Sequence, residues 1–370
     1  MAIISPTAMT ATATNAAILS VYQAGGGTVY CEAGQWVHDV PIEVRSAVTL
    51  IGEGCGHLDP LDPDPPTDPG RGTFWRQPNG TNLPYLIAFR TSSDGIEPNC
   101  RDARIKAMAF DGNRANNTTG TVGLKANVNP PWDFATQEKR FDKINGVADV
   151  QFWNLSGVGL DAQGRSENTY TNMYVRNAKK GFVSSADTIF IGCIAAVTDE
   201  AGLVVPYQGS VTWEAGKIWW AGRGDGAVPG SGHGALIEGC DSGSVRLSGQ
   251  IQDCTGSALY VKDSYEVSAD LVADSNSVQG AGTWAACTVD NSYGCRIDVR
   301  AVERQTTPTQ KYAFAIINGS QGNNLTGSVR AKGNASFTAA LKPGSDTTNN
   351  WVRVVNLGPG APAAVKADFT

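Results

Sequence analysis

The chain has 370 residues, of which 43 are glycine, and only 17% are charged, against about 25% in an average globular protein. Its hydrophobic content of 41% is enough to form a buried core, which excludes a disordered chain. A formal net charge of −6 gives no long-range attraction to nucleic acid or anionic lipid. No stretch of about 18 consecutive apolar residues is present. We therefore expect neither nucleic-acid binding nor membrane insertion.

Residues 14–54 indicate how the fold begins. Ala16, Ala17, Leu19 and Val21 lie near helical spacing, which predicts a short amphipathic helix at about Thr14–Gln23. A turn of three glycines follows, and then come three predicted strands with the sequences TVYCEAG, VPIEV and AVTLIGEG. Such a helix is expected to cover one open end of a β-structure, because an open end exposes strand edges and core.

The rest of the chain contains an internal repeat, most regular in its C-terminal part. Each copy has a short apolar run, a polar turn and a second run of alternating apolar residues. The turn positions, spaced by 24, 28, 28 and 25 residues, are Cys240, Ser264, Ser292, Ser320 and Ser345. Short alternating runs predict strands, and the period is too short for a propeller blade.

The repeats predict an all-β solenoid, a single-stranded right-handed parallel β-helix in which each strand stacks on its equivalent in the next turn. We expect an N-terminal segment with the capping helix at residues 1–26, the β-helix at residues 27–358 and a tail at residues 359–370.

The N-terminal residues and the cysteines bear on where the protein is made. The first thirty residues lack a basic stretch followed by a continuous apolar one, so no signal peptide is expected. Eight cysteines lie at irregular spacings without a zinc-binding pattern. We expect free, buried thiols rather than four disulfides. Together these features favour a virion protein that is made in a reducing cytoplasm and released by lysis.

The motifs at Gly25–Gly34 and Val48–Gly54 resemble those of the pectin-lyase-like superfamily, in particular phage tailspikes and related polysaccharide depolymerases. The aspartate-rich segment that usually precedes the helix in this family is missing. The resemblance implies a homotrimer in a phage tail, in contact with other tail proteins. It also implies a host surface polysaccharide as the ligand, bound outside the cell and cleaved by a hydrolase or a lyase.

The segment Val211–Gly234 is the strongest candidate for a glycan site, because three of the nine tryptophans fall within eight residues, with charged residues between and after them. Tryptophan faces stack on sugar rings, and charged groups hydrogen-bond sugar hydroxyls. The predicted substrate-binding residues are Trp213, Trp219, Trp220, Arg223 and His233. The alternative is that these tryptophans are core residues of one irregular turn.

Glycoside hydrolysis needs a pair of carboxyl groups, and a lyase needs a base and a cation. Glu214 and Asp225 are the predicted catalytic pair, because they lie eleven residues apart across a glycine-rich bend. Equivalent positions of successive turns lie about 4.8 Å apart, so carboxylates distant in sequence can also be neighbours. Further candidates of that kind are Glu238, Asp241, Asp161, Glu167 and Asp187.

No cofactor is expected. Two loops exceed the length of the repeat. Leu58–Gly70 contains four aspartates and five prolines, for which calcium binding is the alternative to a stiff, solvated loop. Ala126–Phe141 either packs on the solenoid or takes part in a subunit contact.

Three functions stay open. The leading one is a tailspike-like protein that binds and degrades a host surface polysaccharide. The second is a non-enzymatic receptor-binding or structural tail protein of the same fold. The third is a secreted pectinase-type hydrolase or lyase, which the missing signal peptide disfavours.

Overall fold

The computed structural model describes residues 2–55, 72–90, 100–126, 142–207, 209–241, 244–278, 284–305, 309–310, 312–331, 339–343, 349–357 and 365–369. The chain divides into two compact units, Met1–Cys193 and Ile194–Thr370, and each is described by itself. The loop Leu58–Gly70, most of Ala126–Phe141 and the turn position Ser345 lie outside the described residues.

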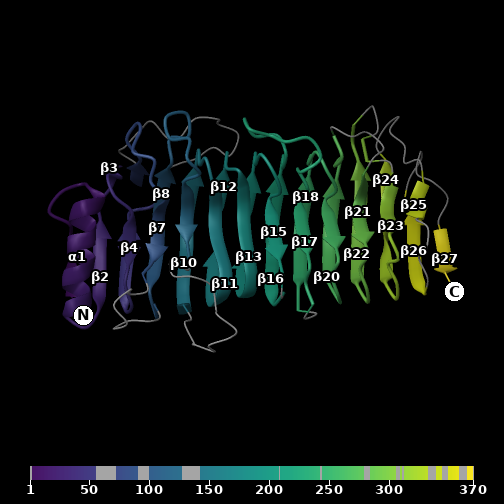
Figure 1. Ribbon diagram of the computed structural model, residues 1–370, viewed down its shortest axis with the longest axis horizontal. Coiled ribbons are helices and arrows are strands. Elements are labelled where there is room, and N and C mark those ends of the chain that lie inside the picture. Colours follow the sequence, from purple (N-terminus) through teal and green to yellow (C-terminus); the bar gives the residue numbers. More distant parts are fainter. Residues whose placement is uncertain are drawn as a thin grey trace. The chain divides into compact units, whose positions relative to one another are not determined.

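The first unit contains one helix, which follows the short strand β1 and precedes all its other strands (Figure 1). Its described elements are β1 (Ala2–Ile4), α1 (Ala11–Gln23), β2 (Gly27–Cys31), β3 (Gly34–Val37), β4 (Ile42–Val44), β5 (Val48–Gly52), β6 (Thr73–Arg76), β7 (Tyr85–Phe89), β8 (Arg104–Asp111), β9 (Val122–Lys125), β10 (Asp142–Trp153), β11 (Val158–Thr171), β12 (Tyr174–Arg176) and β13 (Lys180–Ile191).

The second unit contains strands only among its described residues. They are β14 (Ile194–Ala196), β15 (Leu203–Pro206), β16 (Val211–Trp219), β17 (Ala235–Glu238), β18 (Arg246–Gln252), β19 (Leu259–Lys262), β20 (Ser268–Asp274), β21 (Ala285–Asp290), β22 (Arg296–Glu303), β23 (Tyr312–Ile317), β24 (Asn324–Ala331), β25 (Ala339–Pro343), β26 (Asn350–Asn356) and β27 (Val365–Phe369).

The strands pair as in a solenoid, because most of them hydrogen-bond to the equivalent strand one turn further along the chain. In the second unit, β16, β18, β20, β22, β24 and β26 form one parallel series. The strands β15, β17, β19, β21, β23 and β25 form another. In the first unit, β2, β5, β8 and β10 pair in the same way. This is a parallel β-helix, as predicted, although β27 is antiparallel to its partner, β26.

The predicted turn positions form a hydrogen-bonded ladder inside the second unit. The backbone N–H of Cys240 donates to Oγ of Ser264, that of Ser264 to Oγ of Ser292, and that of Ser292 to Oγ of Ser320, each at 3.1 Å. All four residues are buried. Each hydroxyl therefore satisfies a buried N–H of the preceding turn, which explains why serine recurs at this spacing.

Asparagine forms a second ladder on the same principle. The N–H of Cys295 donates to Oδ1 of Asn323 at 2.9 Å, and the N–H of Asn323 donates to Oδ1 of Asn350 at 3.0 Å. The amide side chain of Asn350 in turn donates to the carbonyl of Ser320 at 2.8 Å. Buried polar side chains thus join consecutive turns.

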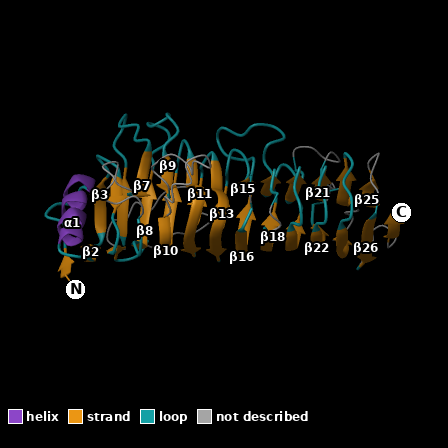
Figure 2. Ribbon diagram, turned by 60° about the horizontal axis from the view of Figure 1, so that its bottom comes forward, coloured by secondary structure: helices purple, strands orange, loops and turns teal. Residues whose placement is uncertain are grey.

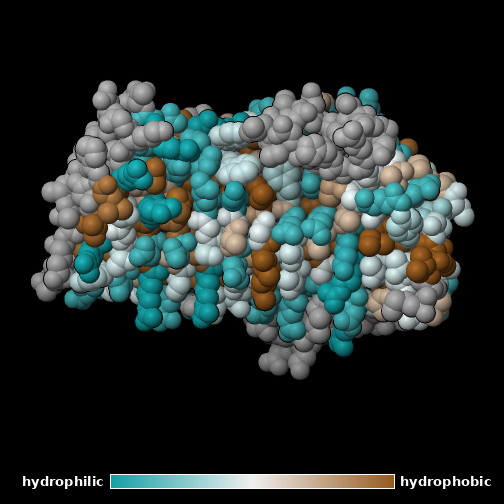
Figure 3. All heavy atoms as spheres, turned by 180° about the vertical axis from the view of Figure 1, so that it is seen from behind, coloured by the Kyte–Doolittle hydropathy of each residue, from teal (hydrophilic) through white to brown (hydrophobic). Residues whose placement is uncertain are grey.

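Large apolar side chains stack in register through the core of the first unit. Trp75, Phe110 and Phe152 are direct partners on β6, β8 and β10, with ring centroids 6.2 and 5.2 Å apart. On the outside, Figure 3 shows one face on which hydrophilic residues predominate among the described ones, with apolar residues in separate patches. The core and the surface therefore follow the period of two that the alternating runs predict.

Helix α1 lies against β2 and β4 at the start of the first unit (Figure 2), which confirms the predicted cap. The side chain of Thr10 accepts the N–H of Ala13 at 3.1 Å, so the helix begins three residues earlier than predicted. After the helix, Gly26 has φ of +105° and a Cβ there would lie 2.7 Å from the Ala47 carbonyl oxygen, which explains the glycine turn.

No helix in the described part is long and apolar enough to cross a membrane.

None of the eight cysteines is in a disulfide bond, and all except the half-buried Cys55 are buried. Burial raises the pKa of the Cys31 thiol to about 12, because the thiolate would lose its hydration. The predicted free thiols are thus confirmed, and they behave as small apolar side chains.

His38 makes the stability of the first unit dependent on pH. Its ring is fully buried beside Trp75 and Phe110, with Nε2 2.7 Å from the Leu86 carbonyl oxygen and Nδ1 without a partner. Burial lowers the pKa of His38 from 6.5 to about 4. The unfolded chain therefore binds more protons between these values, so stability is fully present above pH 6.5 and is lost as the pH falls towards 4.

We expect this loss to be on the order of 2–4 kcal/mol for His38 alone. Urea unfolding of the parent and of His38→Phe across that pH range measures it, since the carboxylates contribute equally to both proteins. The parent should lose more stability than the variant on acidification. Parallel pH profiles for the two proteins would contradict the assignment.

Candidate functional site

Strand β16 carries an irregularity that exposes a carboxylate. Its register with β18 shifts between Trp213 and Gly216, so that Glu214 and Ala215 together lie opposite Ser248. Ala215 has φ of +53°, and its N–H donates to Oγ of Ser248 at 3.2 Å. This is a β-bulge, and it leaves both bulged residues exposed to solvent.

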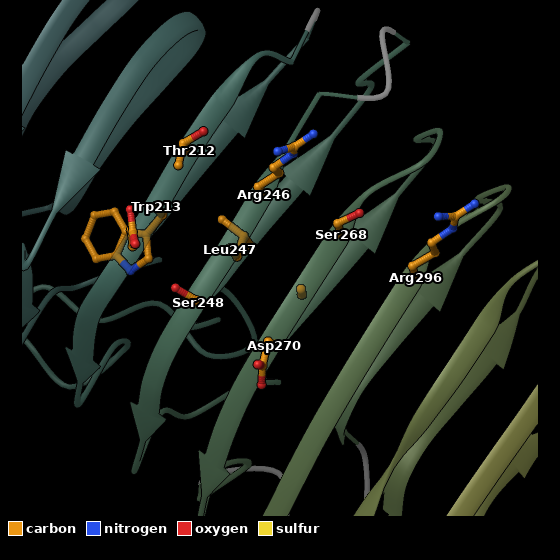
Figure 4. Close-up of a pocket in the computed structure, with 10 residues that line it drawn as sticks. Thr212, Trp213, Arg246, Leu247, Ser248, Ser268, Asp270 and Arg296 are labelled. Carbon is orange, nitrogen blue, oxygen red and sulfur yellow. The ribbon is translucent and has the colours of Figure 1, made fainter.

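A groove of about 420 Å³ lies over the bulge and the strands that follow it, β18, β20 and β22 (Figure 4). It is lined by Thr212, Trp213, Glu214, Arg246, Leu247, Ser248, Ser268, Ala269, Asp270 and Arg296. A second cavity of about 360 Å³ adjoins it and shares Ser248 and Asp270. Together they form one open surface across four parallel strands, which we call the groove.

The register places the outward side chains of the groove in rows that cross the strands. The first row is Thr212, Arg246, Ser268 and Arg296; the central row is Glu214, Ser248, Asp270 and Asp298; the third row is Lys217, Gln250, Val272 and Arg300. Neighbours within a row are separated by one strand spacing, about 4.8 Å. A row with carboxylates therefore runs between two rows with cations.

Five charged groups of the groove have no ion pair with any described residue. They are Glu214, Lys217, Arg246, Asp270 and Arg296, all of them exposed. Charges elsewhere in this unit do pair, as in the 2.8 Å contact between Nη2 of Arg304 and Oδ2 of Asp274. The charges of the groove are therefore available to a ligand without an existing pair being broken.

The predicted tryptophans do not form an exposed platform. Trp213 is only 3% exposed, and its indole lies on the backbone of Gly216, where a Cβ would collide with it. Trp219 and Trp220 are half-buried. The Trp219 ring lies 5.6 Å from Nζ of Lys217, and its Nε1 is buried without a partner. The structure thus places Trp213 beneath the groove rather than on its surface.

Arg223, Asp225 and His233 lie on the loop between β16 and β17, and none of them lines the groove. Arg223 and Asp225 are exposed. His233 is buried and stacks on Tyr260 at 4.7 Å, and its Nδ1 accepts the N–H of Ser257 at 3.1 Å. Burial lowers the pKa of His233 to about 4, so the ring is neutral at physiological pH.

Of the predicted carboxylate pair, only Glu214 lies in the groove, and the second carboxylate that lines it is Asp270. Among the other candidates, Glu238 is 2.6 Å from Nζ of Lys262, in an ion pair on β17 and β19. Asp161, Glu167 and Asp187 belong to the first unit.

Asp270, Arg246 and Arg296 were not predicted from the sequence. These residues occupy polar positions of ordinary alternating strands, and nothing local distinguishes them. The available signal was long-range, because Ser248, Asp270 and Asp298 recur at intervals of 22 and 28 residues, the period of the turns.

No group of three or more His, Cys, Asp or Glu residues that could hold a metal ion is found within the described ranges. The aspartates of Leu58–Gly70 lie outside those ranges, so the calcium alternative stays a prediction.

The sequence matches no protein-family model and no curated protein. The fold is similar to that of the Azotobacter vinelandii mannuronan C-5 epimerase AlgE6 A-module, with a TM-score of 0.65 and 15% identity over 94% of this chain and 95% of that one. It is also similar to the enzymatically active domain of tailspike protein 2 of bacteriophage CBA120, with a TM-score of 0.63 and 15% identity over 82% of this chain and 44% of that one.

A third similar structure is a tailspike protein of E. coli bacteriophage HK620 in complex with a pentasaccharide, with a TM-score of 0.54 and 11% identity over 95% of this chain and 62% of that one. The chain thus shares the parallel β-helix fold of epimerase modules and phage tailspikes, and the resemblance predicted from the N-terminal motifs is confirmed at the level of the fold.

Because Trp213 is buried, its removal is expected to act on stability. Trp213→Ala should lower the free energy of unfolding by about 3–5 kcal/mol, the usual cost of deleting a buried tryptophan. Thermal melting checks this, with Trp220→Ala as the control, since the half-buried ring should cost less. A Trp213→Ala variant that melts like the parent but no longer binds glycan would show that the ring is a binding surface.

Proposed function

We propose that the protein binds a polysaccharide in the groove and hydrolyses it there. The observation that carries the proposal is the central row, in which Glu214 and Asp270 are exposed, unpaired among the described residues and flanked by rows with cations. Hydroxyl and charged side chains of this kind hydrogen-bond sugar hydroxyls. The pentasaccharide complex of a tailspike with the same fold supports a sugar ligand.

The separation of the two carboxylates suits one type of hydrolysis. Glu214 and Asp270 lie on β16 and β20, two strand spacings apart, which is roughly 9.6 Å between their main-chain positions. Inverting glycosidases hold their carboxyl groups about 6.5–9.5 Å apart, which leaves room for a water molecule. Retaining enzymes need about 5–5.5 Å. Side chains that project from positions this far apart can bring their carboxyl groups to the separation of inverting enzymes, so we propose inversion for this pair.

The proposed reaction consumes one water molecule for each bond cleaved. One carboxylic acid of the pair gives its proton to the glycosidic oxygen while the bond from that oxygen to the anomeric carbon breaks. The other carboxylate takes a proton from water, whose oxygen forms the new bond to the anomeric carbon from the opposite face. The products are a new reducing end with inverted configuration and a free hydroxyl on the leaving sugar.

We expect Glu214→Gln and Asp270→Asn each to lower turnover by about 10²–10⁴-fold, because each removes a proton-transfer group, while glycan binding survives. New reducing ends measure turnover, and proton NMR of the first product gives its configuration. Asp225→Asn is the matched control, since Asp225 lies outside the groove and should leave turnover unchanged.

Loss of turnover in Asp225→Asn but not in Asp270→Asn would contradict this pair and restore the one predicted from sequence. Unsaturated sugar ends with ultraviolet absorbance would show a lyase instead. Binding without cleavage would show a receptor-binding protein.

We also propose that the protein acts at a host cell surface as part of a phage tail, together with other tail proteins, and that it is a homotrimer. The fold shared with two phage tailspikes supports this setting. On β13 of the first unit, Ile189 and Ile191 are 44% and 38% exposed, on either side of the buried Phe190. Two neighbouring exposed isoleucines suit a contact between copies of the chain.

Light scattering is expected to give the mass of three 38.9 kDa chains. Replacing Ile189 and Ile191 together by aspartate should shift the protein towards monomers, while a conservative double replacement by valine should not. A monomeric parent protein would contradict the trimer.

A further inference from the structure

The first row of the groove alternates between cations and hydroxyl groups. Thr212, Arg246, Ser268 and Arg296 are direct register partners on β16, β18, β20 and β22. Figure 4 shows the two arginine side chains extending in the same direction, with Ser268 between them. The two arginines are exposed and have no ion pair with a described residue. The row thus has two available guanidinium groups, one on every second strand.

The spacing between the two arginines matches the repeat length of a sugar chain. Arg246 and Arg296 are two strand spacings apart, roughly 9.6 Å. A polysaccharide that crosses the strands advances by about two pyranose rings over that distance. The guanidinium fork binds a planar carboxylate through two parallel hydrogen bonds. Two carboxylates on alternate rings can therefore face Arg246 and Arg296 together, and the ring between them faces the hydroxyl of Ser268.

The central row disfavours a carboxylate on the intervening ring. Asp270 lies two residues after Ser268 on the same face of β20, about 7 Å along the strand. Once each arginine has bound a carboxylate, a third carboxylate placed over Ser268 has no cation left to pair with. The exposed Asp270 carboxylate, which has no ion pair with a described residue, then repels it. Asp298, which follows Arg296 in the same way, instead accepts a hydrogen bond from Oγ1 of Thr326 at 2.6 Å, on the side of β24.

We propose that the groove recognises an acidic polysaccharide with a disaccharide repeat, in which one sugar carries a carboxylate and the next is uncharged. This proposal rests on the proposed function in one respect: it requires that the groove binds a glycan, but not that the glycan is hydrolysed. Arg246 and Arg296 bind the two carboxylates, and Ser268 contacts the neutral sugar. A chain with a carboxylate on every ring is disfavoured by Asp270, and a neutral chain leaves both arginines unused.

Binding to defined polymers tests the proposal. Isothermal titration uses oligosaccharides of three alternating polymers (hyaluronan, unsulfated chondroitin and heparosan), oligomannuronate as the chain that is acidic on every ring, and dextran as the neutral chain. At least one alternating polymer is expected to bind more tightly than oligomannuronate and dextran, with an affinity that falls as salt is added.

Arg246→Gln and Arg296→Gln should each weaken that binding by about ten- to a hundredfold, the effect of losing a charged hydrogen-bonding partner. Arg246→Lys should restore part of it, since lysine keeps the charge without the fork. Lys262→Gln, on β19 and outside the groove, is the control and should bind as the parent does. Thermal melting identifies any variant that fails to fold.

Equal affinity for dextran, tighter binding of oligomannuronate, or unchanged affinity in both arginine variants would overturn the proposal. The proposed hydrolysis is judged separately, because reducing ends from any bound polymer that disappear in Glu214→Gln would support it whichever polymer binds. If no polymer binds, both the proposed recognition of an alternating acidic polysaccharide and the proposed hydrolysis are overturned.

Discussion

The structure depends on the in-register stacking of successive turns, one strand spacing apart. Each turn would leave backbone N–H groups buried without partners where the chain bends, and a serine or asparagine side chain of the next turn accepts them. The ladder through Ser264, Ser292 and Ser320 is the most regular example. Since every rung is bonded to the next, the outward residues are also held in straight rows, and their spacing is set by the backbone rather than by side-chain packing.

The groove is a direct consequence of this constraint. Residues that are 22 to 28 positions apart in sequence, such as Ser248, Asp270 and Asp298, become neighbours because they occupy the same place in consecutive turns. The local departure from the pattern is the bulge at Glu214 and Ala215, which turns a carboxylate outward at the end of the central row. A site of this type is assembled across strands, and the rigid ladder beneath it pre-organises the charges for a long ligand.

The fold could be predicted from sequence because its causes repeat. The recurring serines, the alternating apolar runs and the helix near Thr14–Gln23 each follow from a local requirement for hydrogen bonding or burial. The site could not be predicted in the same way. A charged residue at an exposed strand position has no local effect on folding. Arg246 and Asp270 are therefore distinguished from other polar surface residues only by the charged residues beside them on neighbouring strands. Those neighbours depend on the strand register, which a single sequence does not give.

The tryptophan-rich segment illustrates the opposite error. Large aromatic residues and charges alternate there, and this pattern suits a sugar-binding surface as well as the edge of a core. The structure separates the two, because Trp213 and His233 are buried while Glu214, which directly follows Trp213 in the chain, is exposed. The Trp213 and His233 rings pack in apolar surroundings, whereas the bulge turns the Glu214 carboxylate towards solvent.

We propose that a sugar chain lies across β16, β18, β20 and β22. The decisive test of this position is a crystal structure of the Glu214→Gln variant with a bound oligosaccharide that the parent protein cleaves. The sugar rings are expected to follow the rows, with the scissile bond between residues 214 and 270. Rings found on the loop between β16 and β17, or on the first unit, with the groove unoccupied would contradict it.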